Sequence, residues 1–152
     1  MIYLLGIDHQ VQHQKQTRDS VVFAFYLSEK IKELNIKLIG EEWFQDLLKE
    51  NGVATTATQD VAQRNQVEHR FCDPNRNERS VIGWRSKSDD SVREKFWLEK
   101  IKDVTDQNVI FVCGADHLSS FSKLLTDTRY ICEILPTRFD IVTYFKSENR
   151  DS

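Results

Sequence analysis

Short apolar runs that each stop at glycine, proline or an acidic residue constrain the fold of this chain most strongly. Four of them cover residues 2–7, 36–39, 69–72 and 109–113, and two further candidates cover residues 130–135 and 140–145. Each run is brief and rich in Val, Ile, Leu, Phe or Tyr, which is typical of strands that are buried on both sides. The pattern therefore predicts a sheet with a covered face on each side.

Segments with helical spacing separate these runs, at residues 20–34, 42–50, 59–65, 91–104 and 117–125. Ser91 and Glu94 have the spacing of a capping box at the start of the fourth segment. Strands that alternate with helices favour a mostly parallel sheet, because the helix supplies the crossover that parallel neighbours require. We therefore predict an α/β fold, with a mostly parallel central sheet and helices on both faces. Its 152 residues and 39% hydrophobic content suit a single compact domain, over residues 1–146.

The stretch at residues 74–90 is polar, contains Arg76, Arg79 and Arg85, and has no clear period. It predicts a long loop, and long loops in compact domains often serve as lids or binding loops. Trp84 lies within it and would anchor a lid or contact a partner, so a homo-oligomer is one expectation. The polar tail at residues 147–152 predicts disorder.

Composition narrows the classes of partner. A formal net charge of -3 gives no strong attraction to nucleic acid or to an anionic membrane surface. The first apolar run is too short for a signal sequence, and no stretch is long enough to span a bilayer. Three widely spaced cysteines without a CxxC pair indicate reduced, mostly buried thiols. We therefore expect a cytoplasmic protein.

The most informative pattern is a short motif that occurs twice, G-x-D-H, at residues 6–9 and again at residues 114–117. Each copy follows an apolar run, so in a parallel sheet both copies would lie at the carboxyl edge, where ligands bind. The same edge would receive the acidic residues that end two other runs. The side chains that we expect to converge there are Asp8, His9, Glu41, Glu42, Asp73, Asp116 and His117.

This set of side chains has a chemical use. Imidazole and carboxylate groups suit a divalent ion such as Zn, Mn, Fe, Ni or Mg, and a metal would offset repulsion between clustered carboxylates. We take His9, His117, Asp8 and Asp116 as the candidate metal ligands. Without a metal, crowding would raise some carboxyl pKa values and could leave one group as a general acid or base.

A simpler interpretation also accounts for the motif. Glycine ends each strand, and Asp or His then caps the following helix by satisfying its free N–H groups. His13 follows His9 by four positions, which is a ligand spacing only on a helix, and its glutamine-rich surroundings favour a solvated turn instead.

These residues, in this order, resemble the erythromycin-esterase, ChaN, TraB and TIKI group of domains, in which two G-x-x-H motifs, a strand-end glutamate and an arginine mark the site. Residues 6–9 resemble the first G-x-x-H motif, and Glu41 or Glu42 resembles the glutamate. Asp73 resembles the acid that ends a strand, and Arg93 resembles the arginine that opens the helix before the last motif. Residues 93–125 resemble the TraB C-terminal pattern most closely.

The resemblance implies metal-dependent hydrolysis, seen in TIKI as proteolysis, and it implies that Glu41, Glu42, Asp73 and Arg93 act in catalysis. The chain is much shorter than a usual TraB or TIKI domain, and Glu94 stands where the family often has Asn. Members of the group differ widely in chemistry, so the likeness fixes no substrate.

The first hypothesis is therefore a metal-dependent hydrolase that acts on a small molecule or a peptide. His9 and His117, with Glu41 or Glu42, would hold a divalent ion whose bound water attacks an ester, amide or phosphate. Arg93 would position or neutralise an anionic group of the substrate.

Two other classes of function stay open. Asp8, Glu42, Asp73 and Asp116 would suit a Mg- or Mn-dependent nuclease or phosphoesterase with an all-carboxylate site. A non-catalytic module would instead hold a small ligand or a peptide in the same crevice. The sequence has no glycine-rich phosphate loop, which argues against an ordinary dinucleotide or nucleoside triphosphate site.

Overall fold

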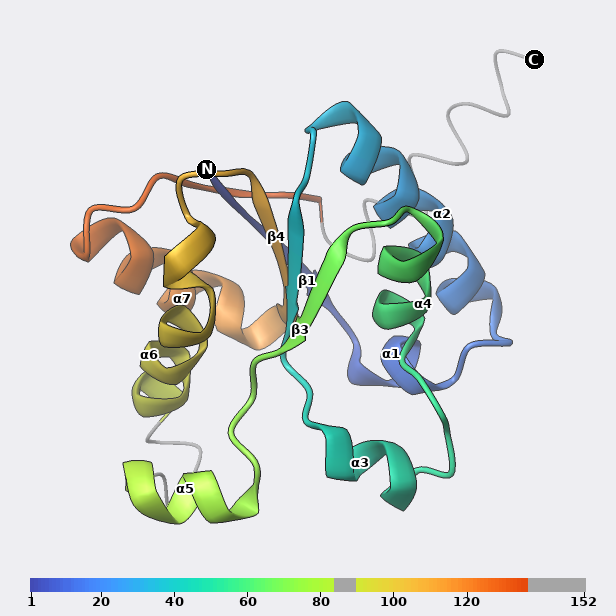
Figure 1. Ribbon diagram of the computed structural model, residues 1–152, viewed down its shortest axis with the longest axis horizontal. Helices are drawn as coiled ribbons and strands as arrows, with labels where there is room; N and C mark the ends of the chain where they lie inside the picture. The colour runs from blue at the N-terminus through green and yellow to red at the C-terminus, as the bar shows by residue number, and fades with distance from the viewer. Residues whose placement is uncertain (84–89, 137–152) are drawn as a thin grey trace.

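The computed structural model describes residues 1–83 and 90–136, and in these ranges the chain forms one five-stranded parallel sheet. The strands are β1 Ile2–Ile7, β2 Leu38–Glu41, β3 Glu68–Phe71, β4 Val109–Gly114 and β5 Cys132–Ile134. Their order across the sheet is β3-β2-β4-β1-β5 (Figure 1). The predicted α/β fold with a parallel sheet is confirmed. The strand expected at residues 140–145 and the tail at residues 147–152 lie outside the described residues.

Helices cover both faces of the sheet, as predicted (Figure 1). The helices are α1 His9–His13, α2 Arg18–Glu33, α3 Gln45–Glu50, α4 Ala57–Arg64, α5 Arg76–Ile82, α6 Asp90–Ile101 and α7 Leu118–Asp127, with 3-10 turns η2 at Lys102–Val104 and η3 at Ala115–His117. Side chains of α1, α2 and α4 pack against one face, and those of α6 and α7 pack against the other. The strand ends that lead into α1, α3 and α5 therefore share the carboxyl edge.

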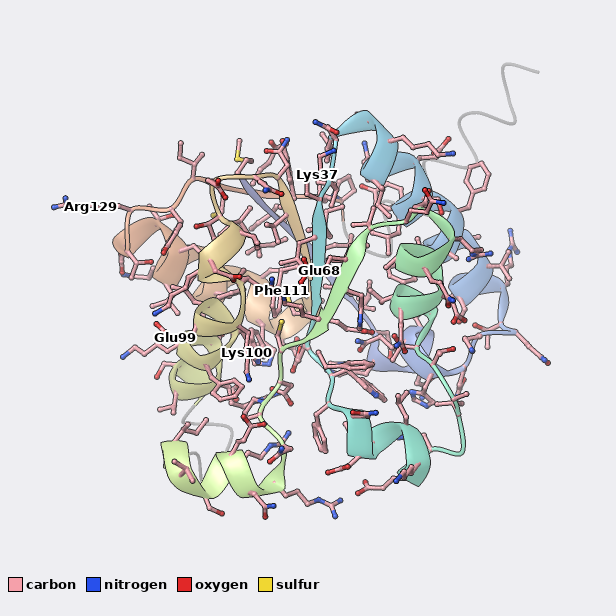
Figure 2. The ribbon with its side chains drawn as sticks, viewed as in Figure 1. Lys37, Glu68, Glu99, Lys100, Phe111 and Arg129 are labelled. Atoms are coloured by element: carbon pink, nitrogen blue, oxygen red, sulfur yellow. The ribbon has the colours of Figure 1, made fainter. Side chains whose placement is uncertain are left out.

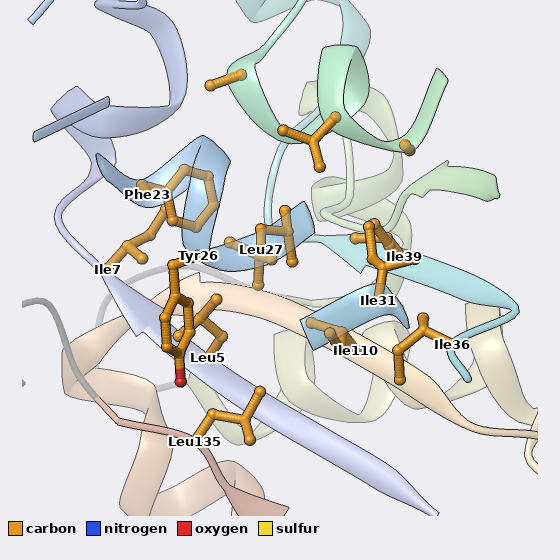
Figure 3. Close-up of a cluster of buried hydrophobic side chains, with 14 of the residues drawn as sticks. Leu5, Ile7, Phe23, Tyr26, Leu27, Ile31, Ile36, Ile39, Ile110 and Leu135 are labelled. Atoms are coloured by element: carbon orange, nitrogen blue, oxygen red, sulfur yellow. The ribbon is translucent and has the colours of Figure 1, made fainter. Parts of the chain in front are cut away.

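The two faces hold two separate hydrophobic clusters, and β1 supplies both. Leu5 and Ile7 pack with Phe23 and Leu27 of α2 on one face (Figure 3). The alternate residues of β1 pack on the other face with Trp97 of α6. Phe111 of β4 lies in the interior of that second layer, whereas Arg129 extends from the rim of the molecule (Figure 2). Burial on both faces explains the apolar runs of the central strands β1, β2 and β4. The expectation of burial on both sides is wrong for β3 and β5, which lie at the edges of the sheet and are only partly buried.

The prediction of one long loop at residues 74–90 is wrong for its central part. Arg76–Ile82 forms helix α5, which begins with a capping box between Asn75 and Glu78 and ends at Gly83 with φ of 77°. None of the residues of α5 is buried, so the helix lacks the apolar period by which a helix is recognised. Trp84 and Arg85 lie outside the described residues.

The helix expected at residues 42–50 begins only at Gln45. The reason is that the backbone continues past β2 in an extended form: the N–H of Glu42 donates to the carbonyl of Val112 at 2.8 Å. This bond keeps Glu42 beside β4 and places its side chain in the interior instead of on a helix. The late start of α3 therefore creates the centre of the candidate site.

Cys72 and Cys113 are buried inside the fold, as expected. Burial raises the pKa of the Cys72 thiol to about 12, and burial raises the pKa of Cys113 well above its ordinary value. Both thiols therefore stay protonated and act as packing groups.

Among the described residues, every helix is too short or too polar to cross a membrane.

Candidate functional site

The carboxylate of Glu42 is the centre of a buried polar network at the carboxyl edge of the sheet. Its Oε2 accepts a hydrogen bond from the backbone N–H of Gly114 at 2.7 Å, which joins the end of β2 to the end of β4. Its Oε1 accepts from Nη2 of Arg93 at 2.7 Å. Nε2 of His117 lies 3.4 Å from the same oxygen, and Nε2 of His9 lies 3.7 Å from it. Both predicted histidines therefore face one carboxylate oxygen.

Asp73, which follows β3, forms the second acidic group of this network. Its Oδ1 accepts from Nε and Nη2 of Arg93 at 3.0 and 2.9 Å, and from Nε1 of Trp97 at 2.9 Å. Its Oδ2 accepts from Nη2 of Arg79 at 2.9 Å. Arg93 thus bridges Asp73 and Glu42, and two guanidinium groups balance the two carboxylates.

Glu94 holds His117 from the opposite side. Nδ1 of His117 lies 3.0 Å from Oε1 of Glu94, and the hydroxyl of Ser120 donates to the same oxygen. The expected capping box is therefore wrong, because α6 starts before Ser91 and the Glu94 side chain is buried inside the fold. A signal for this role is present in the sequence: Glu94 is an acid on the apolar face that also carries Trp97.

Glu41 points away from Glu42 and reaches a different set of partners. Its Oε1 accepts from Nε2 of Gln12 at 2.9 Å. Its Oε2 lies 2.8 Å from the hydroxyl of Thr56 and 2.7 Å from Nε2 of His69. Consecutive residues of an extended strand face opposite ways, so only one glutamate of the pair could face both histidines. The structure assigns Glu42 to that place.

Gln12 links Glu41 to His9. The carbonyl oxygen of the Gln12 side chain lies 2.6 Å from Nδ1 of His9, and its amide nitrogen donates to Glu41. Both residues lie on the short helix α1, three positions apart, so this contact is local. Sequence reasoning missed Gln12 because glutamine carries no chemistry of its own that would mark a site.

Two pKa shifts follow from this geometry. Burial alone would raise the pKa of Glu42, but the hydrogen bond with His117 and the charges of His9, His117 and Arg93 hold it below its ordinary value. Burial alone would lower the pKa of His117, but its hydrogen bonds to Glu42 and Glu94 raise it to about 10. At neutral pH the network therefore contains an ionised Glu42 and a doubly protonated His117.

The other predicted site residues lie at the margin of the network around Glu42. Asp8 is the N-cap of α1, where its carboxylate accepts from the backbone N–H of Gln10 at 3.0 Å, so the capping interpretation holds for this residue. Asp116 is exposed in η3. His13 is helical, contrary to the solvated turn that we expected, and its ring lies 5.6 Å from that of Trp43.

The two G-x-D-H motifs interlock through their glycines. A methyl group added at Gly114 would lie 2.9 Å from Nε2 of His9, which belongs to the other motif. A methyl group added at Gly6 would lie 2.6 Å from the side chain of Leu118, which follows the second motif. The two glycines therefore have a steric reason, since Gly114 makes room for a side chain of the other copy and Gly6 makes room for the residue that follows the other copy.

The predicted metal ligands fit a divalent ion poorly as they lie. Within residues 1–83 and 90–136, no three His, Cys, Asp or Glu side chains are arranged to hold a metal ion. Arg93 already occupies Oε1 of Glu42.

Arg79, Arg93 and protonated His117 also supply the positive charge that we had expected a metal to provide. They balance the three carboxylates of this network, which belong to Glu42, Asp73 and Glu94. The divalent metal stays a prediction.

Access from solvent differs sharply within the network. The side chain of His9 is 48% exposed, whereas that of Glu42, 3.7 Å away, is 3% exposed. A molecule that arrives from solvent therefore meets the imidazole of His9 first, with the buried charges behind it.

Comparisons with protein-family models, with curated proteins and with solved structures found no match for this chain.

Proposed function

We propose that this protein is a hydrolase of ester or amide bonds, with His9 as its general base. The observation that carries the proposal is the pair formed by His9 and Glu42. Nε2 of the half-exposed imidazole faces the buried Oε1 at 3.7 Å, while Gln12 holds the opposite ring nitrogen. The resemblance of the two G-x-x-H motifs to the erythromycin-esterase group supports hydrolysis as the reaction, and the metal that the resemblance also implies is tested separately below.

In this proposal His9 removes a proton from water through Nε2 as the water oxygen attacks the carbonyl carbon of the substrate. The imidazolium that forms lies beside the carboxylate of Glu42, whose negative charge stabilises it. When the tetrahedral intermediate collapses, the bond to the leaving group breaks and His9 returns the proton to that group. Water is consumed, and an acid and an alcohol or amine are released.

Arg93 and His117 support this scheme from behind the reacting pair. They hold Glu42 ionised, because both place positive charge against Oε1. Asp73 keeps Arg93 in this position through its bonds with Nε and Nη2.

The charge balance favours an ester or amide over a phosphate. Phosphate hydrolysis requires positive charge that is free to meet several anionic oxygens. Here the guanidinium group of Arg93 is already bonded to Glu42 and Asp73, and that of Arg79 is bonded to Asp73. The nuclease hypothesis also needs Asp8 as a ligand, whereas Asp8 caps α1.

The test is the rate of hydrolysis of p-nitrophenyl esters of increasing acyl length, with p-nitroanilides as the amide probe. We expect saturable turnover by the wild-type protein, and a fall in kcat of at least about 100-fold in His9→Asn, since a general base contributes on that order. His13→Asn is the matched control, because His13 lies on the same helix but packs against Trp43. It should keep kcat within about twofold of the wild-type value, the spread expected of a residue outside the reaction.

A metal arm separates this proposal from the metal-dependent hypothesis. The same assays are run after treatment with EDTA and again after addition of Mn, Zn or Mg. Turnover that survives EDTA and depends on His9 supports the acid-base proposal. Turnover that is lost with EDTA and restored by one ion, or that persists in His9→Asn, would overturn it.

A further inference from the structure

A second buried carboxylate, outside the cluster around Glu42, is connected to its reactive histidine. Glu41 is fully buried, and three donors surround its two oxygens: the amide of Gln12, the hydroxyl of Thr56 and the imidazole of His69. A carboxylate only accepts hydrogen bonds, so the group of Gln12 that faces it must be the NH2 group. Burial of such a group is costly unless its partners are held in this way.

The orientation of the Gln12 amide then determines which ring nitrogen of His9 carries the hydrogen. Because the NH2 group of Gln12 faces Glu41, its carbonyl oxygen must face His9, at 2.6 Å from Nδ1. A carbonyl oxygen only accepts, so Nδ1 of His9 carries the hydrogen. The neutral imidazole then has its lone pair on Nε2, the atom that faces the site, because the bond made by one ring nitrogen sets the state of the other.

We infer that Glu41 is a positioning residue that sets the tautomer of His9 through the side chain of Gln12. Glu41 touches neither His9 nor the reacting atoms in this scheme. Its charge chooses which end of the Gln12 amide turns toward His9, and that choice leaves Nε2 unprotonated. Both glutamates of the strand-end pair then have a role. Glu42 lies beside Nε2 of His9, and Glu41 acts on the Nδ1 side of the ring through Gln12.

This inference rests on the proposed function only in treating His9 as the general base. The tautomer of His9 is a property of the free protein, so it can be measured without substrate. It is measured by NMR on protein with 15N-labelled histidine, through long-range proton–nitrogen couplings within each ring. The spectra are recorded over a series of pH values, so that the neutral form of each ring is observed directly. The chain has four histidines, and the signals of His9 are those that vanish in His9→Asn.

In the wild-type protein we expect the neutral ring of His9 to be protonated on Nδ1 and unprotonated on Nε2. In Glu41→Gln the partner of Gln12 can both donate and accept, so the amide is free to turn. The Nε2 signal of His9 should then move toward the range of protonated nitrogens. Gln12→Met, which keeps the length of the side chain but removes the amide, should give the same change.

The matched control is Thr56→Val, which removes one of the three bonds to Glu41 but leaves its charge and its contact with Gln12. The tautomer of His9 should stay as in the wild type in this control. A tautomer change that merely follows loss of stability would appear in Thr56→Val as well. A wild-type His9 protonated on Nε2 would overturn the inference. So would an unchanged tautomer in folded Gln12→Met, whatever the outcome of the hydrolysis assays.

Discussion

Gly114 and His9 belong to the two different G-x-D-H motifs, and a methyl group added at Gly114 would lie 2.9 Å from Nε2 of His9. That separation is shorter than carbon and nitrogen atoms tolerate, so the Gly114→Ala protein must push the imidazole out of its place beside Glu42. We expect a loss of at least about tenfold in kcat/KM for ester hydrolysis, since misplacement by about 1 Å costs up to 100-fold. Steady-state kinetics with the p-nitrophenyl esters measure this loss.

Gly6→Ala is the matched comparison for this effect. The added methyl would lie 2.6 Å from Leu118, in the hydrophobic cluster between the sheet and α7. Overpacking of that kind destabilises the fold by about 1–3 kcal/mol. We expect Gly6→Ala to lower Tm while His9 keeps its place, so a larger kinetic defect in Gly6→Ala than in Gly114→Ala would contradict this assignment of the two glycines.

The bonds of His117 to Glu42 and Glu94 predict a pH dependence of stability. The folded pKa of His117 is raised to about 10 from 6.5, so its protonation stabilises the fold fully below pH 6.5. This contribution is lost progressively as the pH rises from 6.5 toward 10. Urea unfolding at a series of pH values should show a decline across that window which is smaller in Glu94→Gln.

A direct titration of His117 tests the raised pKa on which that prediction depends. The pKa of His117, followed by NMR, should fall in Glu94→Gln because one of the two hydrogen bonds to a carboxylate is lost. Ser119→Ala is the control, because Ser119 is an exposed residue on α7, the same helix as Ser120. A wild-type pKa of His117 below its ordinary value, the direction that burial alone would give, would refute the arrangement described here.

Arg93 bridges two buried carboxylates, and its removal should be the most destabilising change in the site. Arg93→Met leaves Glu42 and Asp73 without the cation between them, and breaking a buried pair in this way costs about 3–5 kcal/mol. The free energy of unfolding from urea denaturation measures the loss. Glu42→Gln in the same protein should recover part of it, because one of the uncompensated charges is then removed.

Arg76→Met provides the surface comparison. Arg76 pairs with Glu50 at 2.7 Å, but its side chain is 72% exposed. Exposed ion pairs contribute about 0–1 kcal/mol, so this variant should remain close to the wild-type stability. Equal losses in Arg93→Met and Arg76→Met would mean that the bridge between Glu42 and Asp73 contributes nothing particular to the fold.

The sequence predicted in part which side chains converge, because the ends of apolar runs are visible in it and a parallel sheet gathers the strand ends at one edge. His9, Glu42, Asp73 and His117 lie at the ends of four different strands, and the structure brings them into one network with Arg93. The same reasoning could not choose between Glu41 and Glu42. The alternation along a strand says that they face opposite ways, but which face meets the histidines depends on the register with β4.

Gln12 and Glu94 were missed for a different reason. Gln12 and Glu94 act by holding the far side of an imidazole, and this role depends on three-dimensional placement more than on residue type. Their places also differ from the local pattern: Gln12 lies in a stretch that resembles a turn, and Glu94 fits a capping box that does not form. Helix α5 was missed because it has no buried residue and therefore no apolar period.

The proposed reaction depends most directly on His9 and Glu42 acting as one unit, and a double-mutant cycle in kcat/KM measures this. His9→Asn, Glu42→Gln and the double variant are compared with the wild type in ester hydrolysis. If Glu42 acts by stabilising the protonated imidazole, its substitution has nothing further to remove once His9 is gone. We predict that the double variant is no slower than His9→Asn within about twofold. Losses that multiply, with the double variant slower by the product of the two single effects, would contradict the coupling of His9 to Glu42.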